Sequence, residues 1–443
     1  MYTMNQLQKG DKKLLNAWAF YDWANSVYSL VIASAIFPIF YNALFKIRGN
    51  NYVDVYGYHF KDTAMITFVT ALAFLLVALM SPILSGIADY VGNKLAFLRF
   101  FCYLGGLSCI GLYWFNLHNF FISYTVYLLG LIGFWSSLVF YNSYLPDIAF
   151  PEQQDRVSAR GFSMGYLGST LLLIVNLAMV MSPDTFGITG DSGEAAMKAM
   201  RISFLMVGIW WIGFSHITYY YLPKGVSTGH KVTKAVVLDG FKELRIVWND
   251  VKQNIVLKRY LTSYFVFIMA VQTVMLVATY FGAEEIIWET PSQKTTGLII
   301  SILVIQIVAI LGAFLTSRAS GKFGNINVLI FLNAFWAALC CFAFFVETPN
   351  EFYAIAGFVG LVMGGIQSLA RSTYSKFLPE TPDTASYFSF YDVTEKVGIV
   401  IGMSIYGIID QVTGSMRNSI VFLAVFFILG LILLLRVPNK KEN

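Results

Sequence analysis

Long runs of apolar residues dominate the chain and are separated by short polar segments. A helix needs about 20 apolar residues to cross about 30 Å of hydrocarbon. Runs of this length predict twelve membrane-spanning helices, at residues 17–45, 62–88, 95–115, 120–145, 158–182, 199–222, 260–283, 295–317, 326–346, 351–377, 388–411 and 418–437. Because the runs are continuous rather than alternating, they favour helices over the strands of a membrane barrel. The sequence therefore predicts an all-α, multi-pass integral membrane protein.

The composition agrees with a lipid environment. Of the 443 residues, 57% are hydrophobic and only 12% are charged, whereas soluble domains carry about 25% charged residues. The net charge of +5 comes from basic residues in short loops, so it indicates membrane topology and not the binding of nucleic acid. The four cysteines lie in apolar helices without further ligands at metal-binding spacing. We expect the lipid bilayer as a partner and neither a metal nor a cofactor.

Lysine and arginine are distributed unevenly between the two sets of loops. With the N-terminus inside, the cytoplasmic segments carry twenty-two of the thirty basic residues and the outer segments carry seven. Basic residues accumulate on the cytoplasmic side of membrane proteins, and an even number of spans places both termini on one side. We predict two cytoplasmic termini, in the cell (inner) membrane if the source is bacterial.

The longest cytoplasmic segment divides the spans into six and six. Each half contains a Leu-Pro-acid sequence, ending at Asp147 and at Glu380, followed by a polar connection and a glycine-bearing helix. Such internal duplication is typical of secondary transporters. We predict an N-terminal bundle (1–222), a linker (223–259) and a C-terminal bundle (260–443), acting as a monomer. Apolar spacing near Val236–Val251 predicts an amphipathic linker helix, lying either on the inner membrane surface or in solvent.

Ionisable side chains inside predicted spans are the first candidates for function, because placing one in hydrocarbon costs about 2.5–3.5 kcal/mol or more. The first span contains Asp22, with Asn25 one turn later. The eleventh contains Asp392, Glu395 and Lys396 on one helical stripe, where a pair between Asp392 and Lys396 leaves Glu395 without a partner in its own helix. These groups either bind a charged solute or carry a proton, or they form a salt-bridge network that closes a gate.

Span ten contains two further polar candidates. Gln367 and Arg371 are four residues apart and share one helical face. One interpretation is a cavity amide beside a cation that holds a carboxylate. The alternative for Arg371 is a side chain that extends to the inner membrane surface.

The loop after the second span reads GIADYVGNK, from Gly86 to Lys94. Gly92 permits a tight turn, Asp89 can cap or pair at a helix end, and Lys94 adds inner charge. The segment resembles the loop 2–3 signature of the major facilitator superfamily, which implies a conformational latch between the halves. The equivalent loop after span eight, SRASGKFGN, has Gly321 where an acid would stand, so the second latch looks degenerate.

Four further stretches carry a more specific resemblance. They read AFYDWANSVYS (19–29), FYNSYLPDI with RVSARGFSMGYLGS (140–148 and 156–169), GGIQSLARSTYSKFLP (364–379), and FSFYDVTEKVGIVIG with TGSMRNSIVFLAVFFILGLILL in the last two spans. Together they resemble the UMF1 (Atg22-like) branch of the major facilitator superfamily. The resemblance implies two six-helix bundles with spans one, four, seven and ten lining a cavity. The candidate lining residues are then Asp22, Asn25, Asn142, Gln272, Gln367 and Arg371.

Span seven departs from the family pattern, because Met269 and Ala270 occupy the positions of an acid and a glycine. The expected coupling chemistry therefore moves to spans one and eleven. We expect a secondary active transporter of a small polar metabolite, linked to protons, with amino-acid efflux favoured because the fungal relatives are implicated in vacuolar export. A transporter-derived solute sensor and an intramembrane lipid-modifying enzyme stay open as alternatives. The sequence GFSMG (161–165) matches a hydrolase elbow but begins a membrane helix, so we expect no enzyme.

Overall fold

The computed structural model describes residues 7–50, 52–55, 57–225 and 234–438. Most of these residues are helical, in α1 (Lys12–Val27), η1 (Tyr28–Ala35), α2 (Ile36–Arg48), α3 (Asp62–Val91), α4 (Lys94–Gly111), η2 (Leu112–Trp114), α5 (Phe120–Ser143), α6 (Leu145–Ile148), α7 (Pro151–Met181), η3 (Pro183–Phe186), α8 (Ser192–Tyr221), α9 (Lys234–Gln253), α10 (Ile255–Glu284), α11 (Pro291–Phe323), α12 (Asn325–Ala343), α13 (Pro349–Phe377), α14 (Thr384–Thr413) and α15 (Met416–Leu434). Strands β1 (Tyr52–Val55) and β2 (Tyr58–Lys61) pair antiparallel. Three basic residues counted in the predicted topology, Lys231, Lys440 and Lys441, lie outside the described residues.

The helices occur where the apolar runs predict them. In the described part of the chain, eleven helices are long and apolar enough to cross a membrane. The remaining predicted span, 388–411, is the helix α14, which has the same length as α10 but contains three ionisable residues within five positions. α14 packs against α3, α5, α10 and α15. Its charges are therefore enclosed by protein, which explains how so polar a helix fits among the apolar ones.

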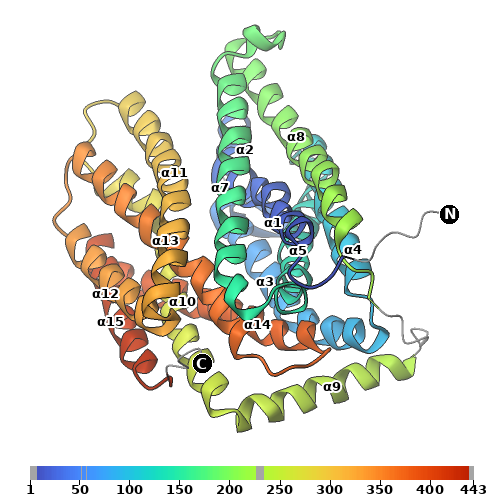
Figure 1. Cartoon of the computed structure of the whole chain (residues 1–443). Helices are drawn as coiled ribbons and strands as arrows, with labels where there is room; N and C mark the ends of the chain where they lie inside the picture. The colour runs from blue at the N-terminus through green and yellow to red at the C-terminus, as the bar shows by residue number, and fades with distance from the viewer. Residues whose placement is uncertain (1–6, 51, 56, 226–233, 439–443) are drawn as a thin grey trace.

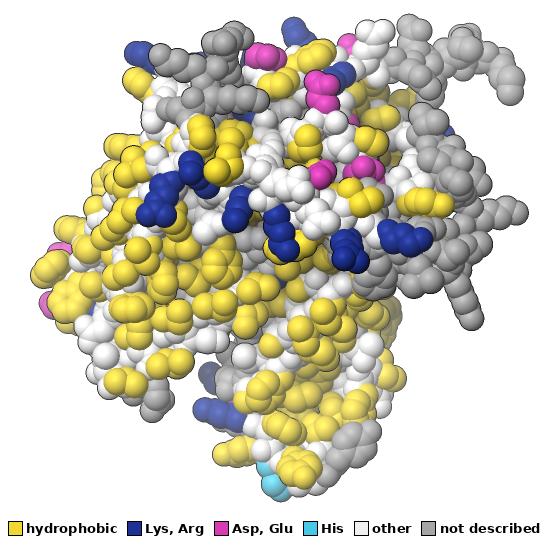
Figure 2. Space-filling model, turned by 90° about the horizontal axis from the view of Figure 1, so that it is seen from below, with side chains coloured by type: hydrophobic (Ala, Val, Ile, Leu, Met, Phe, Trp, Pro, Cys, Tyr) yellow, Lys and Arg dark blue, Asp and Glu magenta, His cyan; other side chains and the backbone are white. Residues whose placement is uncertain are grey.

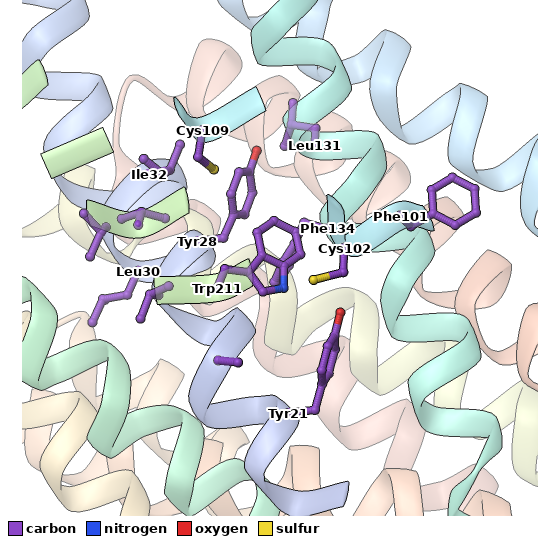
Figure 3. Packing of buried hydrophobic residues seen from close by; sticks show 14 of the residues in the cluster. Tyr21, Tyr28, Leu30, Ile32, Phe101, Cys102, Cys109, Leu131, Phe134 and Trp211 are labelled. Carbon is purple, nitrogen blue, oxygen red and sulfur yellow. The ribbon is translucent and has the colours of Figure 1, made fainter. Parts of the chain in front are cut away.

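The first span is a continuous helix of 37 residues, Lys12–Arg48, with a π-helical segment in its middle. At the end of η1 the Ile36 N–H donates to the Val31 carbonyl, five residues earlier. Figure 3 shows Tyr28 from this segment beside Phe134 of α5 and Trp211 of α8, with ring centroids 4.9 and 5.7 Å away. These large buried rings fix the rotation of the first span against its neighbours.

Two large hydrophobic clusters form most of the interior of the described part of the chain. The first joins residues between Leu14 and Leu222 and has one member from elsewhere, Ala385. The second joins residues between Val247 and Val437 and has one outside member, Tyr166. In Figure 1 the two corresponding groups of helices lie together at the end crossed by α9 and diverge toward the opposite end. We call the end of the molecule that α9 crosses the α9 end. The domain boundaries near residues 222 and 259 stay a prediction.

The linker contains a helix, α9, as the apolar spacing predicts. It packs mainly against α3 and also touches α10 and α14, with Val247 and Val251 buried. The ring of Trp248 stacks on Phe390 of α14 at 5.5 Å. The described apolar side chains of α9 thus contact protein from both groups of helices, rather than lipid or solvent alone. Seen from this end, Lys and Arg side chains form a row across the molecule (Figure 2).

Candidate functional site

Arg371 of α13 lies where the two groups of helices meet, and all five N–H donors of its guanidinium make hydrogen bonds. Nε donates to Ser158 Oγ at 2.9 Å. One terminal nitrogen donates to Asn142 Oδ1 at 3.1 Å and to Asp22 Oδ2 at 3.3 Å. The other terminal nitrogen donates to Asp22 Oδ2 at 3.3 Å and to the Ser158 carbonyl at 3.0 Å. The Tyr141 hydroxyl donates to the same Asp22 oxygen at 2.9 Å. Arg371 is only 3% exposed, so it does not extend to the inner surface. Its charge is balanced by Asp22, which belongs to the other group of helices. We call the surface where the two groups meet the seam.

Three aromatic rings surround this guanidinium. Its Cζ lies 4.2 Å from the ring centroid of Phe162, 4.9 Å from Trp18 and 5.5 Å from Tyr141. Desolvated cation–π contacts of this kind contribute about 2 kcal/mol. A Cβ atom added to Gly161 would lie 3.1 Å from the guanidinium and from the Tyr141 hydroxyl, and closer still to Asp22. The glycine of the GFSMG sequence therefore makes room for the ion pair.

The other predicted polar residues of spans one and ten lie nearby. The Gln367 side-chain oxygen, one turn before Arg371, accepts a hydrogen bond of 2.9 Å from the Tyr166 hydroxyl of α7. Asn25 is buried, and its amide nitrogen has no hydrogen-bond partner among the described residues. Gln367 thus links α13 to α7, and Asn25 lies one helical turn after Asp22 on α1.

A second buried ionic cluster lies on α14. Lys396, 1% exposed, has its Nζ 2.6 Å from Asp392 Oδ1 and 3.5 Å from Glu395 Oε2. The same ammonium lies 3.9 Å from the ring centroid of Trp135, on α5 of the other group of helices. The pair between Asp392 and Lys396 that the spacing predicts is present. Glu395, expected to lack a partner in its own helix, also reaches Lys396.

Two neutral residues complete this cluster. Ser81 of α3 donates to Asp392 Oδ2 at 3.4 Å, and the Gln272 side-chain nitrogen of α10 donates to Glu395 Oε1. Gln272, predicted only to line a cavity, thus holds one of the carboxylates. With two carboxylates and one ammonium ionised, the cluster carries a charge of −1. Side chains of α3, α5 and α10 therefore enclose two carboxyl groups and a single amine on α14.

The predicted latch joins the two groups of helices at the α9 end. Asp89 accepts hydrogen bonds from the backbone N–H of Ser386 at 2.7 Å and of Ala385 at 3.3 Å. These are orphan donors of the first turn of α14, so the carboxylate of one half caps a helix of the other. Gly92 has a φ of +68°, which only glycine adopts readily, and Gly86 is buried within α3.

Lys94 provides a second tie in the same place. Its Nζ lies 2.5 Å from Asp147 Oδ2 and 2.5 Å from Thr384 Oγ1. The Thr384 hydroxyl also donates to Asp147 Oδ1 at 3.3 Å. Lys94 and Asp147 belong to the first group of helices and Thr384 begins α14. The triad therefore fixes the start of α14 beside Asp89.

A third tie at the α9 end was missed by sequence reasoning. Asp155 of α7 accepts hydrogen bonds from Ser320 at 2.8 Å, Lys376 at 2.9 Å and Asn325 at 2.9 Å, all in the second group of helices. The loop after span eight has Gly321 instead of an acid, but the acid comes from the opposite half. Asp155 thus joins the two groups of helices near the loop that lacks the acid, and the degenerate second latch stays a prediction.

Comparison with solved structures defines the class. A crystal structure of the Escherichia coli fucose:proton symporter FucP has a TM-score of 0.68 at 14% identity, covering 97% of this chain and 98% of that one. The human organic anion transporter MFSD10 has a TM-score of 0.67 at 10% identity, covering 96% and 100%. The protein therefore has the all-α fold of the major facilitator superfamily, which confirms the predicted fold class. At these identities the likeness concerns the fold.

Sequence comparison defines the family. Residues 10–443 match the family described as "Vacuole effluxer Atg22 like", and the chain belongs to it. It is 28% identical to the uncharacterized MFS-type transporter YxiO of Bacillus subtilis (strain 168), over 99% of this chain and 97% of that protein. It is 23% identical to autophagy-related protein 22-2 of Aspergillus oryzae, over 88% and 77%. The protein is thus a multi-pass membrane protein of a transporter family, with the bilayer and a small solute as partners.

Proposed function

We propose that the protein is a secondary active transporter that works by alternating access and couples movement of a small polar metabolite to protons. Because the family is described by efflux from the vacuole, an amino acid leaving the cytoplasm is the first solute to test. In this proposal the solute path contains Asp22, Asn25, Asn142, Gln272, Gln367 and Arg371, and the proton path contains Asp392, Glu395 and Lys396. The α9 end is cytoplasmic, both termini lie on that side, and the monomer is the working unit.

The observation that carries this proposal is the pair of buried ionic clusters at the seam. Arg371 is held by residues of the opposite half, and Lys396 lies against Trp135 of the opposite half. Separating the halves at the α9 end exposes these groups, and closing it buries them again. Transporters of this kind bind solute and coupling ions between their two repeats. Charged groups that change exposure between two states couple those states to the ions and solutes they bind.

The proton is assigned to the α14 cluster because its charges do not cancel. Asp22 and Arg371 neutralise each other, whereas Asp392, Glu395 and Lys396 leave one negative charge. Enclosing a net charge in the membrane interior is costly, and a proton on one carboxylate removes that cost. The Glu395 side chain is 15% exposed against 6% for Asp392. Glu395 is the more accessible of the two carboxylates, and we assign the transported proton to it.

Solute counterflow in liposomes tests the proposal. Vesicles with purified protein are loaded with one unlabelled amino acid at a time and receive the same labelled amino acid outside. The parent is expected to accumulate label, and more so when a pH gradient is imposed. Glu395→Gln should keep counterflow and lose the response to the gradient, while Glu284→Gln, which changes an exposed acid at the far end of α10, should keep both.

Each result has a definite meaning. Binding of a solute without any counterflow would show a sensor and not a carrier. A Glu395→Gln variant with an unchanged gradient response would refute the assignment of the proton.

A further inference from the structure

Arg371 is the buried cation of the seam best suited to a carboxylate, and a carboxylate of the protein already occupies it. Asp22 presents one oxygen, Oδ2, to both terminal nitrogens of the guanidinium at 3.3 Å. A carboxylate that uses two oxygens in parallel forms a shorter, bidentate pair with arginine. The Asp22 contact is longer and shares its oxygen with the Tyr141 hydroxyl. The pair is therefore satisfied but geometrically inferior to what an untethered carboxylate can make.

We propose that the solute site recognises a carboxylate and that Asp22 acts as a tethered competitor for it on Arg371. This inference rests on the proposed transport function and adds the chemical class of the solute. When solute binds, its carboxylate replaces Asp22 on the terminal nitrogens of Arg371. When solute leaves, Asp22 returns, so the buried guanidinium is never left without a counter-charge.

The surroundings of Arg371 fit an exchange of this kind. The Nε–H and one terminal N–H are held by Ser158, which keeps the guanidinium plane fixed while its partner changes. Phe162 and Trp18 face the cation at 4.2 and 4.9 Å and exclude water from it. Such a site strengthens the attraction to an anion and provides apolar surface for the rest of a small solute.

In this proposal the solute exchanges with the site from the side away from the α9 end. One turn along α13 from Arg371, Gln367 is half-buried and bound to the Tyr166 hydroxyl of α7 at 2.9 Å. The two groups of helices diverge in that direction (Figure 1). The amide and the phenol are neutral polar groups, so they can receive the uncharged polar part of a solute whose carboxylate lies on Arg371. They also sort solutes by shape without adding a charge that would compete with Asp22.

Removing the competitor should strengthen binding of carboxylates. If Asp22 leaves Arg371 accessible for about a tenth of the time, Asp22→Asn raises apparent affinity about tenfold, because affinity scales with the competent fraction. Transport should slow in the same variant, because nothing replaces the solute on Arg371. A residue that only ties the halves together would give lower stability and no gain in carboxylate affinity.

The experiment measures thermal unfolding of the full-length protein in detergent against ligand concentration. The probes are alanine, acetate and benzoate, each compared with its carboxamide. We expect the carboxylates to stabilise Asp22→Asn at concentrations about tenfold lower than the parent, and the carboxamides to do so in neither. Asp184→Asn removes an exposed acid remote from the seam and should behave as the parent.

A second variant keeps the proposal testable if Asp22→Asn does not fold. Arg371→Lys retains a positive charge but loses the planar fork, so the stabilisation of the parent by carboxylates at high concentration should disappear. Equal binding of acids and amides would overturn the carboxylate assignment, as would the absence of any carboxylate effect in both Asp22→Asn and the parent. Counterflow of a solute without a carboxylate would overturn it too, while leaving the transport function intact.

Discussion

Replacing Asp155 by asparagine should open the seam at the α9 end. The substitution keeps the shape and one acceptor but removes the charge that binds Lys376 at 2.9 Å and Ser320 at 2.8 Å. A hydrogen bond to a charged group contributes about 1.5–3 kcal/mol. Only the closed arrangement has this contact, so its loss shifts the balance between closed and open by the same free energy. The ratio of closed to open molecules should fall roughly 10- to 150-fold.

Distance measurements between spin labels follow this shift. Labels at Arg156 of α7 and Phe323 of α11, both exposed, report on opposite sides of the seam. Cys341 is replaced by serine beforehand, because it is exposed while the other three cysteines are buried. The longer distance should gain population in Asp155→Asn. Glu152→Gln, an exposed acid in the first turn of α7, provides the matched control.

The outcome can refute the reasoning directly. If Asp155→Asn and its parent have the same distribution of distances, the tie does not hold the halves together. If Glu152→Gln opens the seam equally, then net charge at the α9 end is responsible and the individual hydrogen bonds are not.

Two further substitutions probe the packing and the latch. Gly161→Ala should lower stability by about 1–3 kcal/mol through overpacking and stop counterflow, because the new Cβ displaces Asp22. The control is Gly213→Ala, whose new Cβ meets nothing within 4 Å and which should raise helix stability by about 0.5–1 kcal/mol. Equal melting temperatures for the two variants would show that Gly161 does not make room for the ion pair. Asp89→Ala should remove the cap on Ser386, lower stability by about 0.5–2 kcal/mol and speed hydrogen exchange of that amide, followed by mass spectrometry. An unchanged exchange rate would show that Asp89 does not cap α14.

The helices of this protein could be predicted from the sequence because lipid imposes one rule over long stretches. The apolar runs identified every long membrane helix in the described part of the chain, and errors are confined to ends. The fifth span was predicted to begin at 158, whereas α7 begins at Pro151. Its first two turns are polar, with Glu152 and Arg156 exposed and Asp155 buried, so hydropathy does not register them. The π-helical segment Tyr28–Ala35 likewise has no local sequence signal.

The sequence predicted which residues belong to the candidate site, but it did not predict which of them contact each other across the two groups of helices. Asp392 and Lys396 are four residues apart in one helix, so their contact follows from helix geometry alone. Asp22 and Arg371 are separated by 349 positions, and their contact depends on how two bundles are rotated against each other. The same reason hid Asp155, which looks like a surface acid until α11 and α13 are placed beside it. Glu395 was expected to have no partner in its own helix because the helical positions alone were considered. The long side chain of Lys396, the next residue, is able to reach it.

The π-helical segment η1 has a mechanical consequence for the first span. A π-turn holds one residue more than an α-helical turn needs, and such insertions mark positions where a helix can change its register. Ala35, where η1 ends, already departs from helical geometry with φ −123° and ψ −79°. If the extra residue migrates along the helix, the part bearing Asp22 twists about its axis while the part beyond Ile36 stays anchored. Rotation at this point moves the charged end separately from the rest of span one, and it is opposed by the ring contacts that Trp18 and Tyr21 make with Tyr141.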